Sequence, residues 1–223
     1  METGMTITNK EVHAGQAIYS KRTLNAYDFI VLWLSNRFIW RCPTPTLLAH
    51  YNQHISNNHL DVGVGTGYFL DHCQFPSGMP RIALMDLNQN SLAYAAQRIA
   101  RYQPTTHVAN VLEPIHMDAE KFDSIGINYL LHCIPGSLES KAAAFDHLAT
   151  LLNPKGVLFG STILHQGVKR NALAKRLMAF YNSKGVFHNQ HDSLNGLEQA
   201  LRQYFTHVNV TITGCVAIFS ASG

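Results

Sequence analysis

The order of segments along this chain predicts an α/β fold with a mostly parallel sheet. From residue 58 onward, short strand-like runs alternate with amphipathic helical runs, and strands joined through helices form right-handed parallel crossovers. The first of these strands ends in a glycine-rich turn, residues 61–67. The last two strands are separated only by a short turn at Gly214, which requires an antiparallel pair. We therefore expect helices on both faces of the sheet and an antiparallel last strand.

Individual elements follow from hydrophobic spacing and from turn residues. The expected strands are 58–62, 81–85, 107–111, 122–130, 157–164, 207–213 and 215–221. The expected helices of this region are 68–72, 90–101, 138–152, 172–181 and 194–203. Before them we expect a loose arm over 1–18, a helix over 21–40 that ends before Pro43 and Pro45, and a short helix over 46–55.

Composition indicates an ordinary globular domain. The chain has 223 residues, of which 46% are hydrophobic and 14% charged, with a formal net charge of +3. This length suits one well-cored domain. Lys and Arg are scattered, and their one cluster, residues 169–176, lies in a helical pattern and is interpreted as a solvated face. Because a nucleic-acid binder concentrates its cations on one stripe, no nucleic-acid partner is expected.

The cysteines and the N-terminus indicate the compartment. The four cysteines are far apart and form no CxxC pair (Cys42, Cys73, Cys133 and Cys215), which is typical of free thiols in a reducing environment. No secretion signal is recognised at the N-terminus. The most apolar window, residues 29–40, is too short and too polar to span a bilayer. We expect a soluble, cytoplasmic protein.

The glycine turn has the chemistry of a nucleoside-binding site. Glycines at 63, 65 and 67 let the backbone turn sharply and let a ligand approach it closely, at the carboxyl ends of the strands, where open α/β sheets bind ligands. A dinucleotide fold requires GxGxxG, but position 68 is Tyr68. The acid Asp61 would repel a pyrophosphate, whereas it suits the cationic amino-acid end of S-adenosylmethionine.

A second acid, Asp86, ends the next strand. A carboxylate at that place can accept hydrogen bonds from both hydroxyls of a ribose. The two acids together favour a nucleoside ligand over a plain turn with a helix-capping residue.

These motifs resemble those of the class I S-adenosylmethionine-dependent methyltransferases of the small-molecule type. The resemblance covers about residues 58–165 and rests on LDVGVGTG, Asp86, NVLEP, FDSIGINYLLHCIP and LLNPKGVLF. It implies a Rossmann-like sheet of seven strands with the last pair antiparallel, and S-adenosyl-L-methionine as the cofactor. The cofactor-binding residues expected in this interpretation are Tyr19, Asp61, Gly63, Gly65, Gly67, Asp86, Leu87, Asn110, Val111 and Asn128. The stretch 19–43 is also similar to a subgroup of small bacterial and fungal methyltransferases.

The resemblance implies one domain, residues 1–223. We expect residues 1–56 to form an arm and a helical lid, and residues 57–223 to form the cofactor-binding core. Methyl transfer needs mainly alignment and removal of water, and a general base only when the acceptor must lose a proton early.

His132, at the end of the fourth strand, is the candidate base, with packing beside the cofactor as the alternative. The expected substrate-pocket residues are Tyr27, Trp40 and His165, and weaker candidates are His188 and His191. No metal is expected, because acids are missing near the fourth strand. The run 128–131 contains no prolines, unlike the turn of methyltransferases that act on adenine or glutamine amides.

We therefore expect methyl transfer to O, N or C of a small molecule, and no membrane partner. The oligomeric state stays open. The rivals are a non-catalytic partner subunit of the same fold and a nicotinamide-dependent reductase.

Overall fold

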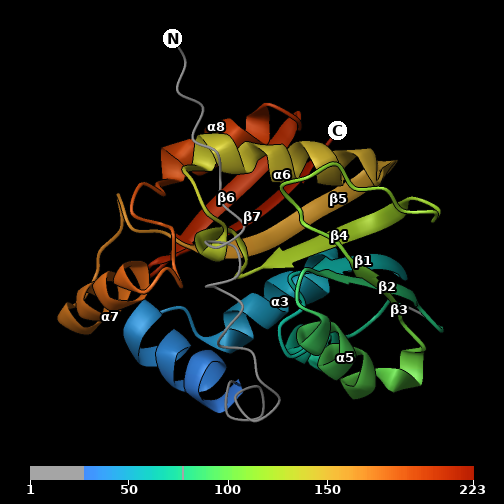
Figure 1. The fold of residues 1–223 in the computed structure, drawn as a ribbon, viewed down its shortest axis with the longest axis horizontal. Helices are drawn as coiled ribbons and strands as arrows, with labels where there is room; N and C mark the ends of the chain where they lie inside the picture. Colours follow the sequence, from blue (N-terminus) through green and yellow to red (C-terminus); the bar gives the residue numbers. More distant parts are fainter. Residues whose placement is uncertain (1–27, 77) are drawn as a thin grey trace.

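A seven-stranded sheet forms the centre of the molecule (Figure 1). The computed structural model describes residues 28–76 and 78–223. The strands are β1 (Asn58–Val62), β2 (Arg81–Asp86), β3 (Thr105–Val108), β4 (Phe122–Asn128), β5 (Leu152–Ile163), β6 (His207–Thr213) and β7 (Val216–Ser222). Their order across the sheet is β3-β2-β1-β4-β5-β7-β6. Strands β1 to β5 pair in parallel, and β7 is antiparallel to both β5 and β6. The predicted fold class is confirmed.

Helices cover both faces of this sheet (Figure 1). The helices are η1 (Asp28–Trp40, of π type), α3 (Thr44–His54), α4 (Tyr68–His72), α5 (Gln89–Arg98), α6 (Leu138–Thr150), α7 (Ala172–Ser183) and α8 (Leu194–Arg202). Within the described residues, two single turns of 3-10 helix complete the set, η2 (Ala100–Tyr102) and η3 (Leu131–Cys133). Helices α6 and α8 share one hydrophobic core with the sheet, and α3, α4 and α5 share another. Helix α7 contacts η1 beside the sheet.

The alternation of side chains along β1 determines which residue reaches which layer. Leu60 and Val62 belong to the core under α6 and α8. His59 and Asp61 are also buried, and they hydrogen-bond to Tyr51 of α3 on the opposite face. The acid of the glycine turn therefore lies on the α3 side of the sheet.

Several predicted strand boundaries were wrong, and those of β3 and β5 differ most. Strand β3 ends at Val108 rather than at 111, because the Asn110 side chain accepts a hydrogen bond from the Leu112 N–H and starts a turn. Strand β5 begins at Leu152 rather than at 157, and its pairing with β4 shifts register between Phe122 and Ser124. Pro154 lies in this extra stretch, and proline is tolerated in sheets at such bulges. Among the described residues, no helix is long and apolar enough to cross a bilayer.

Candidate active site

The glycine turn connects β1 to α4 at the point where the strand order reverses between β1 and β4. Gly63 and Gly65 both have positive φ, 71° and 52°, which L side chains adopt only with strain. A Cβ at Gly63 would lie 2.9 Å from the Leu130 side chain, whereas a Cβ at Gly65 would meet no protein atom within 4 Å. The turn thus packs against the protein at its first glycine and opens into a cleft at its second.

Asp61 is held by a chain of buried hydrogen bonds. The Tyr51 hydroxyl donates to the Asp61 carboxylate at 2.5 Å and lies 3.0 Å from His59 Nε2. His59 Nδ1 in turn lies 2.8 Å from the Ser124 hydroxyl. Burial and the Asp61 charge raise the pKa of Tyr51 well above its ordinary value. Tyr51 therefore stays protonated and acts as a fixed donor that orients the carboxylate.

Asp86 lies at the end of β2, beside the glycine turn. Burial raises the pKa of this carboxyl to about 6, although hydrogen bonds from the N–H groups of Asn88, Val64 and Gly65 act in the opposite direction. The Asn88 N–H donates to Asp86 Oδ1 at 2.8 Å. Asp86 is therefore anionic near neutral pH and has an unusually strong tendency to accept further hydrogen bonds.

The cleft between these acids has a volume of about 150 Å³. It is lined by Leu32, Asp61, Val62, Gly63, Val64, Gly65, Thr66, Tyr68, Phe69, Met85, Asp86, Leu87, Asn88, Ser91, Ala109, Asn110, Val111, Leu112, Asn128, Tyr129, Leu130, Cys133, Ile134 and Pro135. The cofactor residues predicted within the described chain lie here together, with the exception of Gly67, which caps α4.

The cleft contains an unused hydrogen-bond donor. The Asn128 carbonyl oxygen accepts from the Ser161 hydroxyl at 2.9 Å, which fixes the amide, while Asn128 Nδ2 is buried and has no hydrogen-bond partner among residues 28–76 and 78–223. A buried donor left unpaired costs stability, so such a group indicates a ligand atom. Together with the open position at Gly65 and the two acids, it fits a ligand that has hydroxyl donors, an ammonium group and an acceptor oxygen.

Helix η1 forms one wall of the cleft. Leu32 lines it directly, and the buried Asn36 accepts a 2.8 Å hydrogen bond from the hydroxyl of Tyr129. Tyr129 has a φ of 56°, a strained conformation of the kind that clusters at functional sites. Asn36 also donates to Thr44 of α3 at 3.0 Å. The wall is therefore tied both to α3 and to the end of β4.

The geometry gives no support to His132 as a base. Its ring is buried and does not line the cleft. Nδ1 accepts a 3.3 Å hydrogen bond from the Ile163 N–H, and the ring lies edge-on against Phe187 at 4.5 Å. Burial and the charge of Lys141 lower the pKa of His132 to about 3. His132 is therefore neutral, and the one ring nitrogen that could accept a proton, Nδ1, already accepts the hydrogen bond from Ile163.

The other predicted pocket residues are placed away from the cleft lining. Trp40 is buried against Phe187, with ring centroids 5.9 Å apart. The His165 N–H donates to the Asp192 carbonyl at 3.1 Å. His188 and His191 lie on the loop after α7, His191 exposed. Tyr19 and Tyr27 lie outside the described residues.

Several cleft residues were not predicted. Leu32, Phe69, Cys133 and Ile134 give the cleft an apolar wall, and Tyr51 orients Asp61 from behind. The helical spacing over 21–40 predicted the helix that contains Leu32, but it did not indicate which side of that helix faces the cleft. Tyr51 carried no sequence signal, because its partner lies in a different element.

Comparison with known proteins identifies the class. A family described as "Methyltransferase domain" matches residues 60–158. The chain is also 43% identical over 215 residues to "Demethylluteothin O-methyltransferase" of Streptomyces thioluteus, covering 96% of this chain and 94% of that protein. The chain belongs to the S-adenosylmethionine-dependent methyltransferases, and it is an enzyme that transfers a methyl group from this cofactor to a small molecule.

Further relatives have the same character. The chain is 38% identical to "Physcion biosynthesis cluster O-methyltransferase" of Aspergillus chevalieri over 209 residues, covering 93% of this chain and 94% of that protein. Among solved structures, the "DhpI-SAH complex" matches with a TM-score of 0.70 at 14% identity, over 96% of this chain and 97% of that one. The nicotinamide-reductase and non-catalytic interpretations are thereby displaced.

Proposed function

We propose that the enzyme methylates a phenol- or enol-like oxygen of an apolar small molecule. The observation that carries this proposal is the composition of the cleft. Among the described residues, its lining contains no Lys, Arg or His, and its acids are Asp61 and Asp86. A substrate with a carboxylate or phosphate would find no cationic clamp. The apolar wall, by contrast, suits a hydrophobic ring system.

The relatives support oxygen as the accepting atom. The Streptomyces and Aspergillus chevalieri proteins are both named O-methyltransferases, although a relative of Penicillium aethiopicum, 38% identical over 185 residues, is named an N-methyltransferase. The geometry favours oxygen with an acidic proton. Among the described residues the lining contains no His, and we assign its two carboxylates to the cofactor. The acceptor must therefore lose its proton readily, and a phenol has a pKa of about 10, far below that of an aliphatic alcohol.

The roles of the chain's own residues follow from their placement. We assign Asp61, held by Tyr51, to the ammonium end of the cofactor and Asp86 to its ribose hydroxyls. Leu87, Asn110 and Val111 would flank the adenine. When bound, the cofactor would supply an electrophilic methyl group on a sulfonium. The leaving group of the in-line displacement would be the neutral thioether.

The remaining residues of the site exclude water and align the acceptor. Leu32, with Tyr129 held by Asn36, forms the wall over the methyl position. Asn128 Nδ2 provides a fixed donor for an oxygen atom of the bound ligands. Catalysis then arises from proximity and desolvation, with residues 28–40 as part of the lid.

The four free cysteines support a reducing, cytoplasmic compartment.

The proposal is tested in two steps. Isothermal titration with S-adenosylhomocysteine measures cofactor binding, and absence of heat at high micromolar ligand would contradict the site. Release of S-adenosylhomocysteine is then followed with matched acceptors that differ only in the accepting group: a naphthol, a naphthylamine and a naphthalene carboxylate. We expect turnover with the naphthol. Turnover confined to the amine or the carboxylate would refute oxygen methylation while leaving cofactor binding intact.

A further inference from the structure

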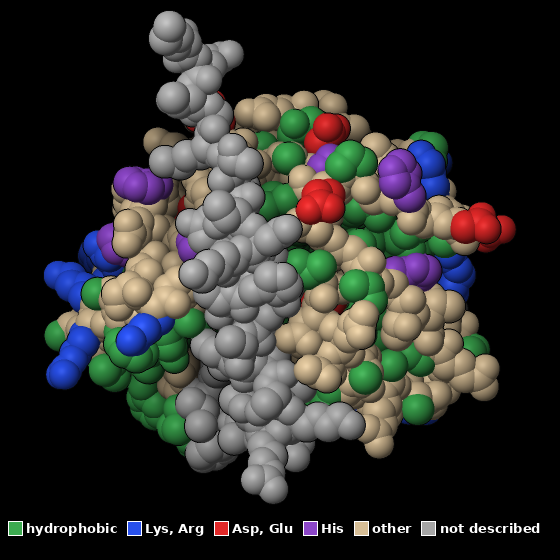
Figure 2. Space-filling model, viewed as in Figure 1, with side chains coloured by type: hydrophobic (Ala, Val, Ile, Leu, Met, Phe, Trp, Pro, Cys, Tyr) green, Lys and Arg blue, Asp and Glu red, His purple; other side chains and the backbone are tan. Residues whose placement is uncertain are grey.

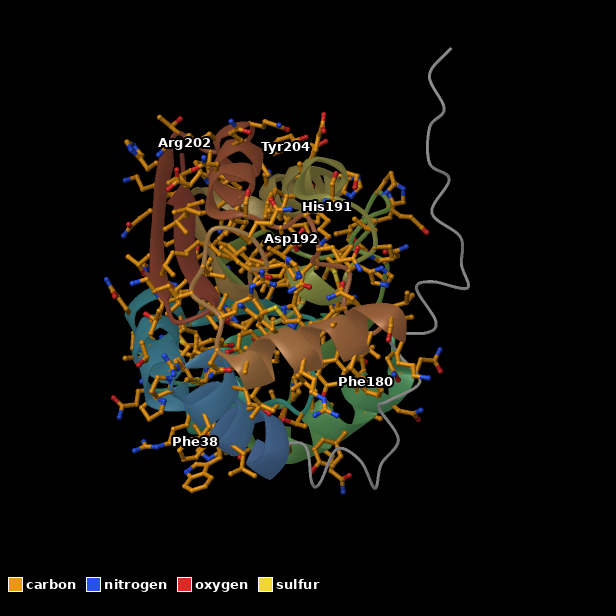
Figure 3. All side chains as sticks on the ribbon, turned by 90° about the vertical axis from the view of Figure 1, so that its left-hand side faces the viewer. Phe38, Phe180, His191, Asp192, Arg202 and Tyr204 are labelled. Carbon is orange, nitrogen blue, oxygen red and sulfur yellow. The ribbon has the colours of Figure 1, made fainter. Side chains whose placement is uncertain are left out.

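Four exposed apolar side chains lie outside the active site, on helices η1 and α7. Trp33, Phe38, Leu173 and Phe180 are each more than half exposed, at 56%, 55%, 53% and 53%. The two helices contact each other and lie together at one edge of the molecule (Figure 1). Figure 3 shows Phe38 and Phe180 on neighbouring helices of the side that it faces. We call the surface formed by these four residues the η1–α7 face.

Cations surround the η1–α7 face. The Arg37 guanidinium lies 5.8 Å from the ring centre of Phe38, and the Lys184 ammonium lies 6.0 Å from that of Phe180. Arg176 is three residues after Leu173 and four before Phe180, so it shares their side of α7. Figure 2 shows apolar side chains with Lys and Arg beside them over this part of the molecule.

The stretch that contains α7 has no compensating negative charge. No Asp or Glu occurs from residue 164 to residue 191, whereas this stretch contains Lys169, Arg170, Lys175, Arg176 and Lys184. The occupant that complements the η1–α7 face is therefore anionic and apolar together. A second copy of the chain is disfavoured, because a two-fold interface would bring each rim of cations against itself.

We propose that the η1–α7 face binds an anionic membrane surface. Helices with Trp, Phe and Leu on one side and Lys or Arg beside them lie in the lipid headgroup region, where acyl chains accept the aromatic rings and anionic headgroups attract the cations. No shaped partner groove is needed for this contact. The helix η1 would lie on the membrane with Trp33 and Phe38 toward the lipid and Leu32 toward the cleft.

This arrangement gives the contact a use in the proposed function. An apolar acceptor dissolved in the membrane would reach the cleft along the helix that forms its wall. That consequence rests on the proposed function, whereas the membrane contact itself does not depend on which molecule is methylated.

Co-sedimentation of the full chain with vesicles tests the proposal. Vesicles of phosphatidylcholine alone are compared with vesicles of phosphatidylcholine and phosphatidylglycerol, each at low and high salt. We expect binding to the anionic vesicles, weakened by salt. The variants Phe38→Ser/Phe180→Ser and Arg176→Glu/Lys184→Glu should each lower the affinity for these vesicles by at least about tenfold.

A matched control removes exposed apolar side chains elsewhere. Met79 and Ile212 are 72% and 39% exposed on other elements, and Met79→Ser/Ile212→Ser should bind vesicles as the wild type does. Titration with S-adenosylhomocysteine, measured separately, confirms that each variant is folded. No binding to anionic vesicles, or binding that the face variants leave unchanged, overturns the proposal. Self-association that the Phe variants abolish, without vesicle binding, would instead assign the face to a second copy.

Discussion

Replacing Gly65 by alanine should weaken cofactor binding and also strain the backbone, and a control substitution distinguishes the two effects. Gly65 has a φ of 52°, and an added Cβ would meet no protein atom within 4 Å. The folded chain thus has room for the methyl group, which would extend into the cleft. Forcing an L side chain into this conformation costs roughly 1–2 kcal/mol. For a domain of this size that cost lowers the melting temperature by roughly 2–8 °C.

The chain contains a matched control at Gly167. Its φ is 74°, and a Cβ there would also meet nothing within 4 Å, but Gly167 does not line the cleft. Gly167→Ala should therefore show the same loss of thermal stability as Gly65→Ala. The two variants differ only in where the new methyl group lies.

Isothermal titration with S-adenosylhomocysteine distinguishes them. We expect Gly65→Ala to bind more than about tenfold more weakly than the wild type, a loss of more than about 1.4 kcal/mol, because the ligand can no longer approach the turn. Gly167→Ala should bind within about twofold of the wild type. Equal affinities of the two variants would refute the assignment of the turn to the cofactor.

Three further predictions concern charged and buried groups. Because the pKa of Asp86 is raised to about 6, the carboxylate becomes protonated below that pH, and the affinity for S-adenosylhomocysteine should fall by up to about tenfold per pH unit there. Asp86→Asn should lack this pH dependence of the affinity. An equal pH dependence in Asp86→Asn would show that another group is responsible. Tyr51→Phe removes the 2.5 Å hydrogen bond to Asp61 and should lower the free energy of unfolding in urea by about 2 kcal/mol; an unchanged midpoint would contradict the role of this bond. Lys141 and Asp192 form a fully buried ion pair at 2.8 Å, so Lys141→Met should cost about 3–5 kcal/mol in the same assay. Lys141→Met/Asp192→Leu should recover most of that loss, and a double variant as unstable as the single one would show that the unpaired charge is not the cause.

The sequence was sufficient for the sheet and for the ligand-facing turn, because both are coded locally. The spacing of hydrophobic residues and the turn residues predicted β1, α4 and β6 with the bounds observed. The acid before the turn and the acid at the end of β2 both line the cleft. These signals need only neighbours along the chain.

Features that depend on distant pairs could not be predicted. Tyr51 is ten residues from Asp61, and nothing in the sequence says that α3 turns this side chain toward β1. The fourth-strand histidine looked well placed for chemistry, but the Ile163 N–H takes its lone pair. The early start of β5 depends on pairing with β4 across a bulge, which the Asn-Pro-Lys-Gly sequence alone indicates only as a loop.

The buried chain of hydrogen bonds behind Asp61 also constrains how this protein can evolve. Tyr51, His59 and Ser124 come from three separate elements, and the hydrogen bonds among them connect α3, β1 and β4 behind the carboxylate. A lineage that exchanged the acid for an apolar residue would remove the carboxylate that accepts from the buried Tyr51 hydroxyl. Such a change should therefore be accompanied by a substitution at position 51, so that positions 51 and 61 change together while the exposed surface diverges independently.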